Sequence, residues 1–182
     1  VCARRKAIMP DVRIGIGTKK GGYVVTDTDG SWRLTGPLFP GWRVTAWARS
    51  PDGGYLTAIS SSWFRASLHR SSDLETWEPI VPGPAYAAGS GRRLEHVDTV
   101  TAAEGRLYAG VTEAGLFTSD DHGATWAVNQ ALDTYPGRET WIPDLGGLSA
   151  HHVIAVGSRL WAAISAVGVF RSDDHGETFV RT

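Results

Sequence analysis

Ser119–Trp126 reads Ser-Asp-Asp-His-Gly-Ala-Thr-Trp, and the chain repeats this stretch at Ser172–Phe179 as Ser-Asp-Asp-His-Gly-Glu-Thr-Phe. The similarity extends upstream, because residues 100–126 and 153–179, offset by 53 positions, are identical at 13 of 27 positions. An internal repeat of this kind indicates that one supersecondary unit occurs more than once and that neighbouring units stack on each other.

Two weaker copies precede this pair. Ser71–Trp77 is one residue shorter and lacks the glycine, whereas Thr26–Trp32 keeps the glycine and the tryptophan but is also one residue short. The four copies begin at residues 26, 71, 119 and 172, so their mean spacing is about 49 residues. A period of roughly 40–50 residues with several short strands per unit is typical of propeller blades.

Each unit contains the same series of short apolar segments. In the third unit, Arg106–Thr112 and Leu116–Ser119 predict two strands, and Trp126 opens another after the acidic turn. An upstream strand, which we expect to be the innermost, completes four per unit; it is predicted at Val44–Ala48, Leu94–Thr101 and His151–Val156. We therefore predict an all-β chain, a β-propeller of four-stranded antiparallel blades.

The spacing predicts about four blades in a single propeller domain, with approximate boundaries at residues 1–36, 37–82, 83–134 and 135–182. We expect these blades to belong to a larger propeller. The alternative is a minimal closed ring of four blades, with Ala3–Met9 as the first inner strand. An open set of blades would leave a sheet uncovered and favour self-association.

The repeated turn has a structural explanation in its residue types. An aspartate accepts hydrogen bonds from backbone N–H groups a few residues further on, a glycine takes a positive φ, and short hydroxyls add further bonds. The aromatic residue that ends the motif is expected to be buried between sheets. The residues with these roles are Ser119, Asp121, Gly123, Thr125 and Trp126; Ser172, Asp174, Gly176, Thr178 and Phe179; and, in the shorter copy, Asp73 and Trp77.

The motif Ser-x-Asp-x-Gly-x-Thr-Trp resembles the BNR or Asp-box repeat family of sialidase-like and sortilin-like propellers. The segments Ile14–Gly21, Ser60–Phe64 and Gly146–His152 are similar to bacterial BNR-repeat glycosyl hydrolases and exo-alpha-sialidases. The resemblance implies a propeller whose Asp-boxes lie at the periphery, away from any active site. It marks the fold and leaves the chemistry open.

Composition excludes several classes of function. The 18 basic and 19 acidic residues give a net charge of −1, which argues against nucleic-acid binding through bulk charge. The single cysteine excludes an internal disulfide framework, and no apolar run is long enough to span a membrane. Val1–Pro10 lacks the apolar segment of a signal peptide, so we expect a cytoplasmic protein.

The sequence predicts neither a metal nor a cofactor. The acidic segment Asp27–Gly30 has Gly36 where a calcium loop of the EF-hand type places an acidic ligand. The paired carboxylates Asp120/Asp121 and Asp173/Asp174 recur with the turn, which favours a structural role over acid–base catalysis.

Polar residues on the predicted inner strands are the first candidate site, because the inner strands of a propeller converge on its channel. These candidates are Glu95, His96, Asp98 and His152. His96 and Asp98 are expected to share one face of a strand by alternation. The alternative is that these side chains contact water in the channel and perform no chemistry.

Two predicted loops form the second candidate site. Residues 60–69 contribute Trp63 and Arg65, and residues 135–147 contribute Arg138, Glu139, Trp141 and Asp144. Aromatic side chains beside arginines and carboxylates suit a carbohydrate or a peptide. The alternative is that Trp63 and Trp141 pack back onto the blades.

Three functions therefore remain open. The first is a non-catalytic propeller that binds a carbohydrate or protein ligand on its channel face, and the second is an assembly factor for a larger complex. The third is a sialidase-like glycoside hydrolase, which would need three converging arginines and a tyrosine nucleophile. The Arg-Ile-Pro segment of sialidases is missing, and Trp141-Ile142-Pro143 is the nearest match. Whether the chain is an enzyme is left open.

Overall fold

A computed structural model describes residues 12–28, 30–61 and 63–182. Within these residues the predicted all-β fold is confirmed, because antiparallel strands form four separate sheets, three of four strands and one of three. The first sheet is β1 Val12–Thr18, β2 Gly21–Thr28 and β3 Ser31–Leu38; the second is β4 Arg43–Arg49, β5 Tyr55–Ser60, β6 Ser67–Ser71 and β7 Glu78–Pro79. The third is β8 Val97–Ala103, β9 Arg106–Val111, β10 Gly115–Ser119 and β11 Ala127–Val128; the fourth is β12 Ala150–Val156, β13 Arg159–Ile164, β14 Gly168–Ser172 and β15 Val180–Arg181.

The three strands of the first sheet correspond to the second, third and fourth strands of the others. Gly17 of β1 lies against the carbonyl oxygen of Val44, just as Gly110 of β9 lies against the carbonyl oxygen of Ala150 in the next sheet. A side chain at either glycine would collide with that backbone, so the position requires glycine. The inner strand predicted at Ala3–Met9 lies outside the described residues.

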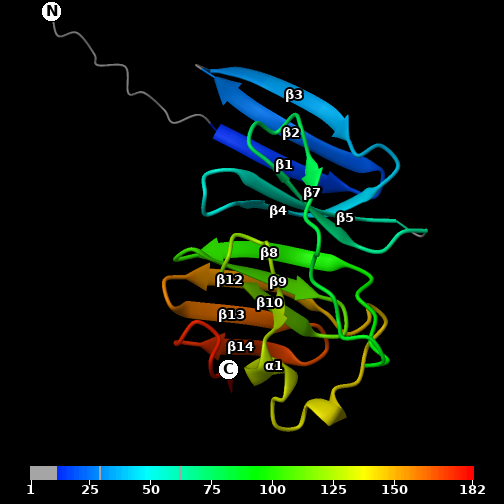
Figure 1. Ribbon diagram of the computed structural model, residues 1–182, viewed down its shortest axis with the longest axis vertical. Helices are drawn as coiled ribbons and strands as arrows, with labels where there is room; N and C mark the ends of the chain where they lie inside the picture. Colours follow the sequence, from blue (N-terminus) through cyan, green and yellow to red (C-terminus); the bar gives the residue numbers. More distant parts are fainter. Residues whose placement is uncertain (1–11, 29, 62) are drawn as a thin grey trace, which may run out of the picture.

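The four sheets follow one another along the long axis of the molecule, with the first sheet at one end and the fourth at the other (Figure 1). Apolar side chains fill each space between neighbouring sheets. Leu56 and Leu68 of the second sheet meet Leu107 and Phe117 of the third. Tyr108 and Leu116, on the opposite face of the third sheet, form a second cluster with Leu160 and Phe170 of the fourth. The second and third sheets alternate their side chains between two neighbouring sheets, because successive residues of a strand point to opposite faces.

The acidic turns have the predicted hydrogen bonds. Asp121 accepts from the Thr125 N–H at 2.8 Å and from the Thr125 hydroxyl at 2.6 Å, and the Ser119 hydroxyl donates to it at 2.8 Å. These donors lower the pKa of Asp121 to about 2. Asp174 makes the same bonds with Thr178 and Ser172, and its pKa is also lowered to about 2.

The shorter turn of the second sheet uses the same device, because Asp73 accepts from the N–H groups of Glu75 and Thr76, both at 2.8 Å. The expected burial of the aromatic residue is only partly met. Phe179 is buried, whereas Trp126 is half-buried and donates its Nε1–H to the Gly123 carbonyl at 3.1 Å. An indole that keeps this local bond must leave one edge at the surface of the turn.

Two short helices interrupt the loop between the third and fourth sheets, α1 at Gln130–Asp133 and the 3-10 helix η1 at Arg138–Thr140. Asn129 caps α1 by accepting from the Leu132 N–H at 2.9 Å, and its amide donates to the Gly176 carbonyl at 2.9 Å. The segment 135–147 was predicted to be irregular; η1 lies within it, and α1 directly precedes it.

Candidate functional site

Two adjoining cavities lie at the end of the sheets where the strands β4, β8 and β12 begin. The large cavity has a volume of about 1060 Å³ and is lined by residues of the second, third and fourth sheets and of the loop before β12. The small cavity, of about 510 Å³, lies between the start of β4, the segment 60–65 and the segment 93–96. They share a wall formed by Arg43, Arg93, Glu95 and His96.

His96 connects the second and third sheets at this shared wall. Its Nε2 lies 3.3 Å from Nη1 of Arg43, and its Nδ1 lies 3.1 Å from Oγ of Ser60. A guanidinium can only donate, so Nε2 is the acceptor and Nδ1 carries the proton of the neutral ring. The buried Ser60 hydroxyl therefore accepts from His96, which is the reverse of the arrangement that activates a serine nucleophile.

Asp98 lies in the large cavity at a β-bulge, where the pairing of β8 with β9 shifts between Val97 and Thr99. Its carboxylate accepts a hydrogen bond from the hydroxyl of Ser149, whose oxygen is also 3.1 Å from the Val111 carbonyl. The contact ties the start of β8 to the segment that leads into β12. Asp98 is thus engaged in holding two sheets together.

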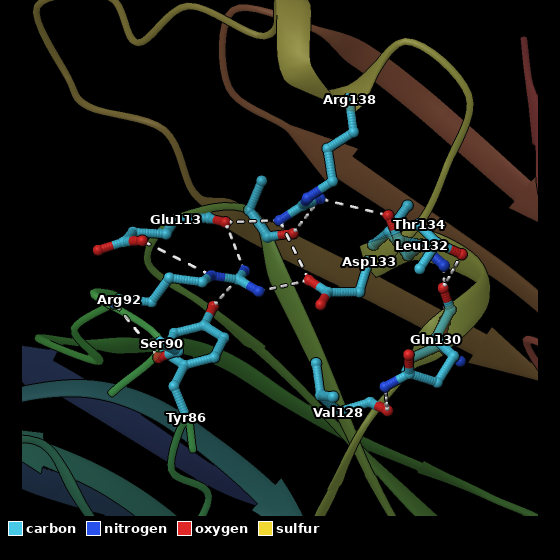
Figure 2. Close-up of polar contacts among 12 residues, drawn as sticks. Tyr86, Ser90, Arg92, Glu113, Val128, Gln130, Leu132, Asp133, Thr134 and Arg138 are labelled. Carbon is cyan, nitrogen blue, oxygen red and sulfur yellow. Dashed lines mark hydrogen bonds and ion pairs between the residues drawn. The ribbon is translucent and has the colours of Figure 1, made fainter. Parts of the chain in front are cut away.

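Arg92, Glu113 and Arg138 line the large cavity and belong to a network of charged groups, whose contacts Figure 2 shows. Asp133 of α1 lies 2.5 Å from Nη1 of Arg92 and 3.5 Å from Nη2 of Arg138, and Glu113 lies 3.6 Å from Arg92. Arg138 also donates to main-chain carbonyls, including that of Glu113 at 2.8 Å, and burial lowers its pKa. The positive charges of Arg92 and Arg138 are therefore already compensated by carboxylates.

Tyr86 completes this network beneath Arg92. Its hydroxyl donates to the Thr112 carbonyl at 2.8 Å and accepts from Arg92 at 3.0 Å, and the guanidinium lies 3.9 Å from the ring centroid. Burial raises the pKa of Tyr86 to about 12. Its hydroxyl stays protonated at physiological pH, which suits a structural donor and is unfavourable for a nucleophile.

Three other arginines at the small cavity have a different environment. Within the part of the chain that the structure describes, Arg43, Arg65 and Arg93 form no ion pair. All three line the small cavity, where Glu95 is the one carboxylate among the described lining residues. With His96 neutral, this lining has an excess of positive charge that can attract an anion.

Aromatic side chains border the same cavity. Trp63 is 90% exposed and Phe64 is 66% exposed, and the Phe64 ring stacks on Trp42 with centroids 5.5 Å apart. The Ser61 hydroxyl accepts from the Phe64 N–H at 2.9 Å and thereby fixes the turn that presents both rings. The rings form an apolar surface directly beside the three arginines.

The structure brings most of the predicted site residues together. Those that line the large cavity are Glu95, His96, Asp98, Arg138 and Asp144; those that line the small cavity are Glu95, His96, Trp63 and Arg65. His96 precedes β8, which begins at Val97 and not at Leu94, so strand alternation does not explain why His96 and Asp98 share the large cavity.

Three predicted residues lie elsewhere. His152 was placed in the channel, but His151 lines the large cavity, because the pairing of β12 with β13 shifts between Ala150 and His152. Trp141 packs on Phe170, with ring centroids 5.1 Å apart, below the guanidinium of Arg138. Glu139 is exposed on η1 and does not line either cavity.

Sequence reasoning missed Arg43, Arg92, Arg93 and His151, which all line the large cavity. A signal was present in their positions, since Arg43 immediately precedes the predicted strand at Val44 and the Arg92-Arg93 pair precedes the one at Leu94. Residues that flank the start of each inner strand would have been the better candidates.

No group of three metal-ligating side chains gathers among residues 12–28, 30–61 and 63–182. Asp29, which belongs to the acidic segment weighed for calcium, lies outside these ranges. Neither helix in the described part of the chain has the length and apolar character needed to cross a bilayer.

Comparisons with known proteins identify the fold to which these sheets and cavities belong. No family model matches the sequence, and no curated protein matches it. Among solved structures, the chain is similar to the GH74 xyloglucanase of Xanthomonas campestris, with 18% identity and a TM-score of 0.61 over 93% of this chain and 26% of that one. It is also similar to YCF48 bound to D1 peptide, with 16% identity and a TM-score of 0.58 over 93% and 49% of the two chains.

YCF48 from Cyanidioschyzon merolae is a third similar structure, with 12% identity and a TM-score of 0.52 over 95% of this chain and 57% of that chain. These neighbours are β-propeller proteins. The chain forms about four blades of a β-propeller. It spans between 26% and 57% of the length of these three structures, and at such low identity the likeness establishes the fold alone.

Proposed function

We propose that this propeller is a non-catalytic binding scaffold whose small cavity takes an acidic segment of a partner protein. The observation that carries the proposal is a group of three arginines, Arg43, Arg65 and Arg93, which have no carboxylate partner among the described residues and line one cavity beside exposed aromatic rings. We also propose that the acidic turns are Asp-boxes with a purely structural role.

The charge of the cavity favours an anionic ligand. Among the described residues that line the small cavity are three arginines and one carboxylate, Glu95, whereas Arg92 and Arg138 of the large cavity are compensated by Asp133 and Glu113. Guanidiniums bind carboxylates through paired, charge-assisted hydrogen bonds, and these are strongest where the cation has no other partner. The carboxylates of aspartate and glutamate side chains fit this requirement.

The shape and the apolar rim favour a peptide. Because the two cavities adjoin and four residues line both, an extended segment could lie across them, with Trp63 and Arg65 lining the small cavity and the fully exposed Leu145 lining the large one. Trp63 and Phe64 offer surfaces for the apolar side chains that alternate with acidic ones along an extended chain. A structurally similar propeller, YCF48, was solved bound to D1 peptide, which supports a protein partner.

The same geometry disfavours catalysis. The Ser60 hydroxyl accepts from His96, so this pair is not arranged for nucleophilic attack. No tyrosine is found among the described residues that line the two cavities, and Tyr86 beneath Arg92 has a pKa raised to about 12.

The experiment is a titration of a short fluorescein-labelled peptide of alternating glutamate and leucine, followed by fluorescence anisotropy. The glutamine–leucine peptide of the same length is the matched probe. We expect the glutamate peptide to bind, the glutamine peptide to bind at least about tenfold more weakly, and affinity to fall as salt is raised.

Arg65→Gln is the most informative variant, since Arg65 is exposed and its change leaves the folded core intact. It should weaken binding of the glutamate peptide by roughly tenfold, because one charge-assisted contact is lost. Arg33→Gln, on β3 and remote from both cavities, is the matched control and should bind as the wild type does. Equal affinity for the two peptides, or an unchanged affinity in Arg65→Gln, would contradict the proposal.

A sialidase-like glycoside hydrolase is the second candidate, and the observation in its favour is the same set of three arginines, which could receive the carboxylate of a sialic acid. Release of fluorophore from a panel of fluorogenic sialosides tests it. Turnover that is lost in Arg43→Gln would support the hydrolase over the peptide-binding scaffold, whereas no release together with peptide binding would support the scaffold.

A further inference from the structure

The side of the fourth sheet that faces away from the third carries apolar side chains that nothing covers in the described part of the chain. Strand register places Ile154, Trp161 and Arg171 in one row of this side, and Ala163 and Val169 in another. Ile154 is 47% exposed, Val156 64%, Val169 38% and Val180 52%. We call this side of the fourth sheet the tail face.

The internal repeat relates the tail face to the side of the third sheet that the fourth sheet covers. With the offset of 53 positions, Trp161 corresponds to Tyr108 and Val169 corresponds to Leu116 of the third sheet. Tyr108 is 0% exposed and Leu116 is 1% exposed, because the fourth sheet covers them. The tail face therefore carries, at equivalent positions, the residues that the third sheet uses to pack against its neighbour.

The first sheet carries the complementary half. The register of β1, β2 and β3 places Ile14, Val25 and Leu34 in one row, and Ile16 and Tyr23 in the next. These residues lie on the side opposite Gly15, Gly22 and Val24, which face the second sheet. Ile14 is 46% exposed, Ile16 40%, Trp32 60% and Leu34 64%. We call this side the head face.

The head face is equivalent to the side that the third sheet turns toward the second. The contact of Gly17 with Val44, matched to that of Gly110 with Ala150, places Ile14 at the position of Leu107 and Ile16 at that of Ala109. Leu107 and Ala109 are fully buried against the second sheet. Head face and tail face are thus the two halves of one sheet-to-sheet interface.

We propose that the tail face of one copy of this chain packs on the head face of a second copy, so that the chain associates head to tail. The contact repeats an interface that the chain already forms between its second and third and between its third and fourth sheets. A head-to-tail contact joins two different surfaces, so it produces either a closed ring or a longer array of copies.

A polar contact accompanies this interface inside the chain and has an unused counterpart on the tail face. Arg106 pairs with Asp120 of its own sheet and also reaches the His175 carbonyl in the acidic turn of the next sheet, at 3.3 Å. Arg159, its equivalent, pairs with Asp173 of its own sheet and is 53% exposed.

Sedimentation equilibrium of the whole chain over a range of concentrations tests the proposal. The wild type should exceed the mass of one chain, and Val169→Lys on the tail face or Leu34→Lys on the head face should each shift the equilibrium by more than about tenfold toward single chains, because each buries an unpaired charge. Ile142→Lys is the control, since Ile142 is 76% exposed and lies on neither face. Circular dichroism confirms that each variant is folded.

Mixing the two variants distinguishes this contact from any other. Val169→Lys keeps an intact head face and Leu34→Lys keeps an intact tail face, so a mixture should form a one-to-one pair that cannot extend. A wild type that remains a single chain at every concentration would overturn the proposal and indicate that other sheets cover these faces in a longer protein. A mixture that remains as single chains, or an association that Val169→Lys leaves unchanged, would also overturn it.

Discussion

Arg106 of the third sheet donates a hydrogen bond to the main-chain carbonyl of His175, 69 positions away in the acidic turn of the fourth sheet. The Tyr108 hydroxyl lies 3.4 Å from the same carbonyl. The turn of the fourth sheet is thus stabilised by its own Asp174 and by hydrogen bonds from Arg106 and Tyr108 of the third sheet. Arg106 also pairs with Asp120 in the turn of its own sheet, as Arg159 pairs with Asp173, which accounts for the arginine at the same distance before both of these turns.

The aspartates of the acidic turns should make the stability of the protein depend on pH in acid. The pKa of Asp121 and that of Asp174 are about 2 in the folded chain, against 3.8 for an ordinary aspartate. A lowered pKa means that the unfolded chain binds protons first, so the contribution is complete above about pH 4 and is lost as pH falls through about 2. Melting temperatures measured across this range should fall steeply.

Two variants test whether the Asp121 carboxylate contributes to this dependence of stability on pH. Asp121→Asn should melt below the wild type at neutral pH, and the difference should shrink as pH falls toward about 2, where the wild-type carboxyl is also protonated. Thr125→Val keeps the carboxyl but removes one of its donors, so its effect should be intermediate. A difference between Asp121→Asn and the wild type that is the same at all pH values would mean that the carboxylate charge is not involved.

Phe170 is the test of packing between the third and fourth sheets. Its ring is 0% exposed and meets Tyr135 edge-on, with centroids 4.8 Å apart. Phe170→Ala should lower the free energy of unfolding by about 3–5 kcal/mol in urea titrations, from lost burial and the cavity that remains. Val81→Ala, at a side chain that is 81% exposed, should change it by less than about 0.5 kcal/mol. A cost below about 1 kcal/mol for Phe170→Ala would refute this packing.

Asp133 should contribute far more to stability than an exposed aspartate. Its side chain is 21% exposed and compensates both Arg92 and Arg138, so Asp133→Asn leaves two largely enclosed guanidiniums with less negative charge. We expect a loss of about 2–3 kcal/mol, somewhat below the cost of breaking a fully buried pair. Asp120→Asn, at a pair whose carboxylate is 68% exposed, should cost about 0–1 kcal/mol. Equal losses in urea unfolding would show that burial is not the deciding factor.

Trp63 should matter for binding and not for folding. Because its side chain is 90% exposed, Trp63→Ala should alter the free energy of unfolding by less than about 0.5 kcal/mol. The same variant should weaken binding of the glutamate–leucine peptide by roughly tenfold, because tryptophan side chains are among those that contribute most to binding. Trp32→Ala on the first sheet, another exposed tryptophan, is the control and should leave peptide affinity unchanged. A normal affinity in Trp63→Ala would remove the aromatic rim from the proposed site.

The repeat made the architecture predictable from sequence. The copies at Ser119 and Ser172 gave the period, and the period together with alternating apolar residues predicted the strands of the third and fourth sheets, which the structure confirms. Hydrogen bonds within the turn were predictable for the same reason, because an aspartate, a glycine and two hydroxyls at fixed spacing act locally. Local chemistry of this kind does not depend on the rest of the fold.

The site was less predictable, because it depends on contacts between sheets and on strand irregularities. The bulges at Asp98 and after Ala150 shift the alternation by one residue, which placed His151 and not His152 in the large cavity. Arg138 and Trp141 were both candidates for contact with a ligand, but α1 supplies Asp133 to Arg138, and Trp141 packs on Phe170, which is the alternative that the sequence left open for this residue. A four-residue helix has too weak a sequence pattern to be found in advance.

The outermost strands differ sharply in length, and this difference has a consequence for misfolding. β7 and β11 have two residues each, which is too short for a foreign strand to extend the sheet, whereas β3 has eight. A long, exposed edge is where fibril growth begins in sheet proteins, and Pro37 near the end of β3 interrupts only part of it. If this protein forms amyloid on partial unfolding, the segment 31–36 should be the part that nucleates it.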